Sequence, residues 1–562
     1  MSGQTWRLVR RGGGRPAEPP VLDEHQRAVV AHPGGPLLVL AGPGTGKTTT
    51  IVESVVERIE RRGADPERVL ILTFSRKAAG ELRERVTARL RRTTRTPLAL
   101  TFHSYAYALL RREAVLAGEA PPRLLTGPEQ LLEIRRLLHG ELEDGAREWP
   151  ASLREALKTR GFAEELRDLL SRAAERGLDG ERLEELGRRH GRGDWVAAGR
   201  FATRYQRRFD LDPEPALDYA ELIRAAAGLL ADPDVRRRER AAHDVVFVDE
   251  YQDTDPAQEL LLRQLAGDGR DLVAVGDPDQ SIYGFRGADV RGILKFPERF
   301  RTLDGRDAPV LALRVCRRSG TGLLEASRRI AARLPVAPFP DPVTPLPDPT
   351  PQGGAQRPTA SRRRVHGHRE LLSLPEADAG EARVLLADST SQEAAVVADT
   401  LRRAHLIDGV PWHRMAVLVR SATRQVPLLR RALVSAGVPT MVAGDEVPIA
   451  QEPGVRPLLT LLRVALDAGE LDEGVAEELL TGPLGGTDMI GVRRLRRALK
   501  IAENEAADSV EERDPSGRRS SGELLVAALK DARELTRVEP HVALPAERVA
   551  GLLAAAREAV RA

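Results

Sequence analysis

A glycine-rich run that ends in a lysine and a threonine could bind the phosphates of a nucleotide. Residues 41–48 read AGPGTGKT and fit the pattern of an Ala or Gly, any four residues, then Gly-Lys and a Ser or Thr. Glycines let successive backbone N–H groups point inward around phosphates, and the N-terminus of a following helix adds partial positive charge. Lys47 would reach the β- and γ-phosphates of the nucleotide, and Thr48 would hold Mg²⁺. The predicted nucleotide contacts here are Ala41, Gly42, Pro43, Gly44, Thr45, Gly46, Lys47, Thr48 and Thr49.

An acidic pair follows another apolar run. Residues 245–248 read VVFV, and Asp249 and Glu250 come directly after them. At the end of a strand Asp249 could reach Mg²⁺, and Glu250 could accept a proton from the attacking water. Acids often cap strands, so the pair is weak evidence alone, and a chance glycine-rich turn is the alternative interpretation of residues 41–48. Together the two features predict a nucleotide hydrolase.

The segments that must position these residues follow an α/β pattern. Residues 112–210 interrupt it with charged sequence rich in Leu, Ala, Arg and Glu, which predicts a helical insertion folded out of the sheet. Continuous apolar runs predict buried parallel strands at residues 36–41, 68–74, 244–248 and 271–275, with helices at 48–61 and 75–92.

A proline-rich stretch at residues 335–357 favours a semi-rigid extended linker. Beyond it, a second α/β unit is expected, with strands at residues 382–387 and 415–419 and helices at 391–404, 427–436 and 457–468.

Composition favours a globular protein of several domains. A length of 562 residues suggests about three to five domains, and the net charge of +3 does not by itself indicate a nucleic-acid partner. Cys316 is the single cysteine, which excludes an internal disulfide and a CxxC metal site. No apolar run approaches the roughly 20 residues of a membrane span, and the N-terminus lacks the hydrophobic region of a secretory signal. A cytoplasmic protein without a membrane partner is expected.

Two further segments carry a family resemblance. Residues 276–288 (GDPDQSIYGFRGA) resemble the third motif of the superfamily-one UvrD/Rep helicases, and residues 249–253 (DEYQD) resemble their DExQD box. Smaller motifs follow in family order, and the resemblance runs from about Leu22 to Leu480. They are LDEHQ at 22–26, LTFSRKAA at 72–79, TFHS at 101–104 and LDYAEL at 217–222.

The resemblance implies an α/β fold: a RecA-like P-loop motor domain with an all-helical insertion, plus a second, incomplete RecA-like domain that carries its own helical insertion. The expected divisions are a flexible leader (1–20), the first RecA-like domain (21–111 and 211–334) around its insertion (112–210), a Pro-rich linker (335–366), the partial second RecA-like domain (367–480) and the start of a second insertion (481–562).

Roles in the ATP site are also implied by the resemblance. Gln26 would hydrogen-bond adenine, Gln280 would sense the γ-phosphate, and Arg318 would contact that phosphate as an arginine finger does. Arg317 stands where the family has a tyrosine that stacks on adenine. A guanidinium plane can also stack on a base, so base selectivity stays open, as does a surface role for the arginine pair.

For DNA, the resemblance implies that Phe285 stacks on a base and that Tyr283 supports it. Such stacking tolerates any sequence and contributes about 1–3 kcal/mol per base. Further expected DNA-binding residues are Phe74, Lys77, Phe102 and His103. Core packing is the alternative for Phe74 and Phe102, and a structural role is the alternative for His103.

The function implied is an ATP-dependent DNA helicase, 3′→5′ by resemblance, in DNA repair or recombination. One alternative is the motor subunit of a DNA-end-resecting helicase–nuclease, since the sequence most resembles AdnB-like motor subunits that pair with a second helicase-like subunit. Another is an ATP-gated single-strand binding module. A metabolic P-loop kinase would have no use for residues 280–286. The last two helicase motifs were not found in residues 360–562, so an N-terminal fragment that binds ATP and Mg²⁺ but hydrolyses ATP poorly is expected.

Overall fold

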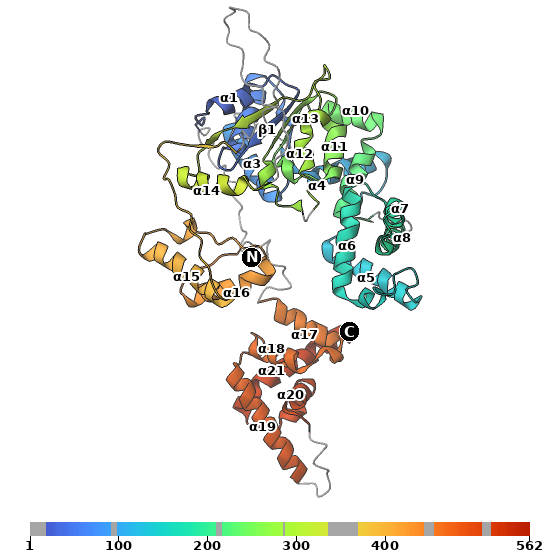
Figure 1. Cartoon of the computed structure of the whole chain (residues 1–562). Coiled ribbons are helices and arrows are strands. Elements are labelled where there is room, and N and C mark those ends of the chain that lie inside the picture. Colours follow the sequence, from blue (N-terminus) through green and yellow to red (C-terminus); the bar gives the residue numbers. More distant parts are fainter. Residues whose placement is uncertain are drawn as a thin grey trace, which may run out of the picture. The chain divides into compact units, whose positions relative to one another are not determined.

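The computed structural model describes residues 18–90, 98–208, 216–284, 287–334, 369–442, 454–508 and 519–561. The chain divides into two units, Met1–Arg383 and Val384–Ala562 (Figure 1). The predicted linker at 335–366 and most of the predicted leader at 1–20 lie outside the described residues.

The first unit is built on a six-stranded sheet in the order β3-β2-β6-β7-β1-β8, and every neighbouring pair runs parallel. The apolar runs predicted as strands are confirmed in β1, β2, β6 and β7. The strands are β1 (Pro36–Ala41), β2 (Val69–Thr73), β3 (Ala99–Thr101), β6 (Val245–Val248), β7 (Asp271–Gly276) and β8 (Val310–Leu313).

Both faces of this sheet are covered by helices, which explains why the strands are apolar throughout rather than alternating. In β1, Leu37 and Val39 belong to one core cluster, and Leu38 and Leu40 belong to the other. The first cluster packs against α1 (Glu24–Ala31), α2 (Lys47–Val56) and α3 (Arg76–Arg89). The second packs against α4 (Phe102–Ala117), α9 (Tyr219–Leu229), α11 (Pro256–Ala266) and α13 (Phe296–Arg299).

Parallel strands bring their carboxyl ends to one edge of the sheet, where ligands of such folds bind. The loop at 42–46 follows β1, the pair Asp249–Glu250 follows β6, and a short 3-10 helix at Pro278–Gln280 follows β7. Smaller elements complete the unit: α10 (Pro233–Ala242), α12 (Arg291–Leu294), α14 (Thr321–Ala331), and the parallel pair β9 (Val315–Cys316) and β10 (Leu372–Ser373).

A helical subdomain with its own core lies between β3 and β6 in the sequence. It comprises α5 (Gly127–Glu143), α6 (Arg160–Glu175), α7 (Gly180–Arg189) and α8 (Gly193–Arg207), which are drawn in cyan to green in Figure 1. Its core includes Ile134, Trp149, Leu166 and Phe201. Two short strands, β4 (Arg123–Leu124) and β5 (Ala216–Leu217), pair where the chain enters and leaves it, although the sequence carried no strand signal there.

The second unit is helical in its described residues. Its helices are α15 (Thr390–Leu406), α16 (Ala422–Ser435), α17 (Arg456–Leu466), α18 (Glu473–Thr481), α19 (Met489–Asp508), α20 (Ser521–Lys530) and α21 (Pro540–Arg561). The last five share one apolar core, which includes Leu479, Leu525 and Leu553. Across the described residues, no helix has the length and apolar character required to cross a bilayer.

The strands expected at 382–387 and 415–419 are not formed, and this part of the sequence-based expectation is wrong for the structure. Neither segment forms regular secondary structure, and Leu386 and Leu418 are 94% and 95% exposed. A strand exists only through hydrogen bonds to a neighbour, and neither segment has one among the described residues.

Candidate functional site

The loop after β1 takes a shape that depends on glycine. Gly44 and Gly46 have φ angles of +75° and +82°, a region that residues with a side chain rarely adopt. The Thr45 hydroxyl donates a 2.8 Å hydrogen bond to the Gly42 carbonyl and is buried. Helix α2 starts directly afterwards at Lys47, so the loop and the helix N-terminus together form the cradle that a phosphate chain requires.

Lys47, which follows β1, contacts side chains that follow two other strands, β6 and β7. Its Nζ lies 3.0 Å from Oε2 of Glu250 and 3.5 Å from Oε1 of Gln280. These contacts span 203 and 233 residues of sequence. The structure therefore brings together the three side chains that were assigned to phosphate binding, water activation and phosphate sensing.

The two acids after β6 lie in different surroundings. Asp249 is 6% exposed, and burial, followed by the neighbouring charge of Glu250, raises its pKa to about 7. Glu250 has a φ of +50°, a strained value for a residue with a side chain, and its carboxylate faces Lys47. A cation bound beside Asp249 would favour the ionised form of this buried carboxylate, and one carboxylate with the Thr48 hydroxyl is a donor set typical of Mg²⁺ bound with phosphates.

Gln252 connects the acidic pair to residues 277–280, here called the sensor segment, and was not assigned a role from the sequence. Its Nε2 donates to Oε2 of Glu250 at 2.8 Å, and its Oε1 accepts from the backbone N–H of Asp277 at 2.9 Å. Gln280 in turn donates to Oδ2 of Asp277 at 2.6 Å. The position of Gln252 in the DEYQD motif was the signal that could have identified it.

Gln26, which was predicted to bind adenine, and Arg317 both contact the loop at Thr45. Gln26 is 1% exposed and donates to the Thr45 carbonyl at 3.1 Å. Nη2 of Arg317 donates to Oε1 of Gln26 at 3.0 Å and to Oδ2 of Asp23 at 2.7 Å. The guanidinium of Arg317 thus donates a hydrogen bond to the side-chain amide oxygen of Gln26.

Arg318 is exposed beside the loop. The Arg317 backbone N–H donates to the Gly44 carbonyl at 2.8 Å, and a Cβ added at Gly44 would lie 2.7 Å from the Cβ of Arg318. The turn after β9 therefore packs directly on the phosphate loop, and Arg318 makes no ion pair with another described residue.

The residues expected to contact DNA divide into two groups. Phe74 and Tyr283 stack on each other, with ring centroids 4.5 Å apart and planes 29° apart. Lys77 is exposed near the start of α3. These three residues remain compatible with a surface that binds bases and phosphates.

The other two described residues fit that role poorly. Phe102 is 2% exposed in the core, so the structure contradicts its expected role as a DNA-binding residue and supports the alternative, core packing. Burial, assisted by the charge of Arg76, lowers the pKa of His103 to about 4, so its ring is neutral at pH 7 and cannot pair with a phosphate as a cation. Phe285 lies outside the described residues.

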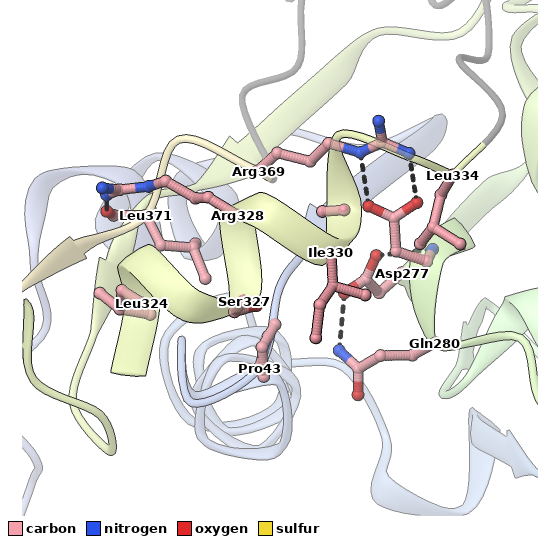
Figure 2. A pocket seen from close by; sticks show the side chains of 12 residues that line it. Pro43, Asp277, Gln280, Leu324, Ser327, Arg328, Ile330, Leu334, Arg369 and Leu371 are labelled. Carbon is pink, nitrogen blue, oxygen red and sulfur yellow. Dashed lines mark hydrogen bonds and ion pairs between the residues drawn. The ribbon is translucent and has the colours of Figure 1, made fainter. Parts of the chain in front are cut away.

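A cavity of about 270 Å³ adjoins the site. Figure 2 shows Pro43 of the phosphate loop, Gln280 and helix α14 around it, with Arg369 extending over one side to an acidic side chain. Arg369 and Asp279 had no role from the sequence.

Comparisons with known proteins point to one family. Residues 22–301 match the family model described as the UvrD/REP helicase N-terminal domain. The chain is 31% identical over 460 residues to ATP-dependent DNA helicase UvrD1 of Mycobacterium tuberculosis, covering 80% of this chain and 53% of that protein. It is 26% identical over 488 residues to ATP-dependent DNA helicase PcrA of Staphylococcus epidermidis, covering 84% and 58%. The chain spans about half the length of the curated relatives it matches.

Proposed function

Because residues 22–301 of the chain belong to the UvrD/REP helicase N-terminal domain family, we propose that this protein is an ATP-driven DNA translocase that works as a helicase. The observation that carries the proposal is the convergence of Lys47, Glu250 and Gln280 at the carboxyl edge of the sheet. Each comes from a different strand end, and each matches one requirement of phosphoryl transfer.

The arrangement supports a division of roles. The phosphate loop, the N-terminus of α2 and Lys47 bind the triphosphate, while Glu250 orients the attacking water and accepts its proton. Thr48 and Asp249 would hold Mg²⁺, which neutralises charge on the phosphates when bound. Gln280 would sense the γ-phosphate, and Arg318 would stabilise the charge that develops on it.

The stacked pair Phe74–Tyr283 supports the choice of DNA as the substrate. Aromatic faces next to an exposed cation such as Lys77 are what a sequence-tolerant single-strand site requires. The 3′→5′ polarity, a role in repair or recombination and a second helicase-like subunit as partner are further proposals that rest on the family resemblance.

One experiment tests the function and separates it from the alternative of an ATP-gated binding module. The purified chain is incubated with duplexes that carry either a 3′ or a 5′ single-stranded tail, and ATP hydrolysis and strand displacement are measured together. We expect slow ATP hydrolysis that single-stranded DNA stimulates, and a small extent of unwinding that is greater for the 3′-tailed duplex than for the 5′-tailed one. Nucleotide-dependent binding without displacement would support the ATP-gated binding module instead, and hydrolysis that ignores DNA would contradict both.

A further inference from the structure

A bidentate ion pair lies beside the ATP site, between residues far apart in the sequence. Nε and Nη2 of Arg369 each lie 2.6 Å from an oxygen of Asp279 (Figure 2). The two side chains are only 12% and 18% exposed. A forked pair with so little solvent access fixes orientation more firmly than an exposed pair does.

The partners of this ion pair belong to opposite sides of the site. Asp279 lies in the short helix Pro278–Gln280, between Asp277 and the sensor Gln280. Arg369 stands just before β10, which pairs in parallel with β9 through Leu372↔Val315 and Ser373↔Cys316. The two residues after β9 are Arg317 and Arg318. Arg369 therefore ties the sensor segment to the strand pair that carries the two arginines.

Contacts on both sides of the Asp279–Arg369 ion pair reach the phosphate loop. On one side, Lys47 reaches Gln280, which donates to Asp277. On the other side, the Arg317 backbone donates to the Gly44 carbonyl. The Asp279–Arg369 ion pair and the β9–β10 pairing connect these two sets of contacts to each other.

The cavity at this point leaves room for movement. Its walls include Pro43, Gln280, the apolar side chain of Ile330 on α14, and Leu334, which follows that helix. Protein interiors are close-packed, so a displaced segment normally forces its neighbours to move. The pocket of about 270 Å³ beside Gln280 leaves this side of the sensor segment less tightly packed, and here the Asp279–Arg369 ion pair connects the segment to the residues before β10.

We propose that Arg369 is a positioning residue of the ATP site: its ion pair with Asp279 holds the sensor segment in register with the strand pair that carries Arg317 and Arg318. The inference rests on the proposed ATPase function. Arg369 acts through Asp279 and Gln280 and touches no reacting atom, so its loss alters turnover much more than nucleotide affinity.

The test compares four forms of the full chain with the wild type. They are Arg369→Ala, Arg369→Lys, the charge exchange Asp279→Arg with Arg369→Asp, and the matched control Arg314→Ala, whose side chain lies 4.0 Å from Glu370 and does not reach the sensor segment. The kcat and KM for ATP are measured with and without single-stranded DNA, and the Kd of a fluorescent ATP analogue by titration. Hydrogen exchange of residues 369–380 is followed with and without a non-hydrolysable ATP analogue.

For Arg369→Ala we expect a roughly tenfold loss of kcat with a change in Kd below about twofold, and loss of the nucleotide-dependent protection of residues 369–380. Arg369→Lys keeps the charge but not the bidentate geometry, so its kcat should lie between those of the wild type and Arg369→Ala. The charge exchange should recover part of kcat. Arg314→Ala should have the kcat of the wild type. An unchanged kcat in Arg369→Ala, or a loss that Arg314→Ala shares, overturns the inference. If the wild type hydrolyses no ATP, the proposed function fails, and the exchange of residues 369–380 still decides whether Arg369 couples this segment to bound nucleotide.

Discussion

Glu250 is the residue whose chemistry the proposed reaction needs most. Its carboxylate is held by Lys47 at 3.0 Å and by Gln252 at 2.8 Å, so Glu250→Gln keeps the shape of the site but cannot accept a proton. We expect kcat for ATP hydrolysis to fall by about 10²–10⁴-fold while ATP affinity stays within about threefold. Steady-state kinetics and nucleotide titration measure the two effects, with the exposed Glu84→Gln as a control. Near-normal turnover in Glu250→Gln would rule out Glu250 as the base.

Glu175 at the end of α6 predicts a pH effect on stability. Burial raises the pKa of Glu175 to about 8, against the opposing charge of Arg172. The other charges that act on it are those of Arg176, Asp218 and Asp255. Because the folded pKa exceeds the unfolded value, the folded state binds more protons, and the wild type loses stability as pH rises from about 4.5 towards 8.

Replacing Glu175 with Gln removes this titration. The melting temperature of Glu175→Gln relative to the wild type should rise between pH 5 and pH 8 by at least about 2–4 °C and then level off. Thermal unfolding at several pH values measures it. The exposed Glu165→Gln on the same helix should show no such trend, and a parallel trend in both variants would contradict the assignment to Glu175.

At the residue scale, sequence reasoning found the groups that sit in contiguous motifs. The loop around Lys47 and the pair Asp249–Glu250 carry local signals, because the backbone and the chemistry need those residue types at that spacing. Arg369 had no such signal, since its meaning depends on Asp279, 90 residues earlier in the chain. Phe102 shows the opposite error, in which a motif position suggested a surface role and the fold buried the ring.

The phosphate loop and the turn after β9 fit together only because Gly44 lacks a side chain. In Gly44→Ala, the new Cβ would lie 2.7 Å from the Cβ of Arg318 and 2.8 Å from Sγ of Cys316, at a φ of +75°. Either the loop or the turn must shift, so we expect a loss of at least about tenfold in ATP affinity and a lower melting temperature. The matched control is Gly80→Ala on α3, where a Cβ meets nothing within 4 Å and should slightly stabilise the helix. Equal ATP affinity in both variants would show that this close approach is unimportant.

At the element scale, the central sheet could be predicted because strands covered on both faces appear as continuous apolar runs. The same reasoning failed at residues 382–387 and 415–419. An apolar run indicates that a segment should be buried, but it does not say which strand will pair with it. Residues 415–419 instead have several side chains beside a cavity of about 250 Å³, also lined by Trp412 and Leu433.

At the scale of the whole molecule, the described ATP-site residues all lie in the unit Met1–Arg383. Arg369 is the last of these residues in the sequence. The helical subdomain, which has its own core, belongs to the same unit. The second unit has a separate helical core around Leu479 and Leu525. Nucleotide binding should therefore depend on the first unit, whatever the second contributes to work on DNA.

A fragment of residues 18–383 should bind ATP with the Kd of the full 562-residue chain, within about twofold, which is under 0.5 kcal/mol. The physical reason is that Lys47, Gln26 and Arg317 have their contacts completed inside the fragment. Titration of both proteins with a fluorescent ATP analogue measures the Kd values, and Lys47→Ala in each should abolish the signal. Circular dichroism first establishes that the fragment is folded. A folded fragment that binds ATP ten times more weakly would mean that residues of Val384–Ala562 contribute to the site directly, and the ATP site could then no longer be assigned to one unit.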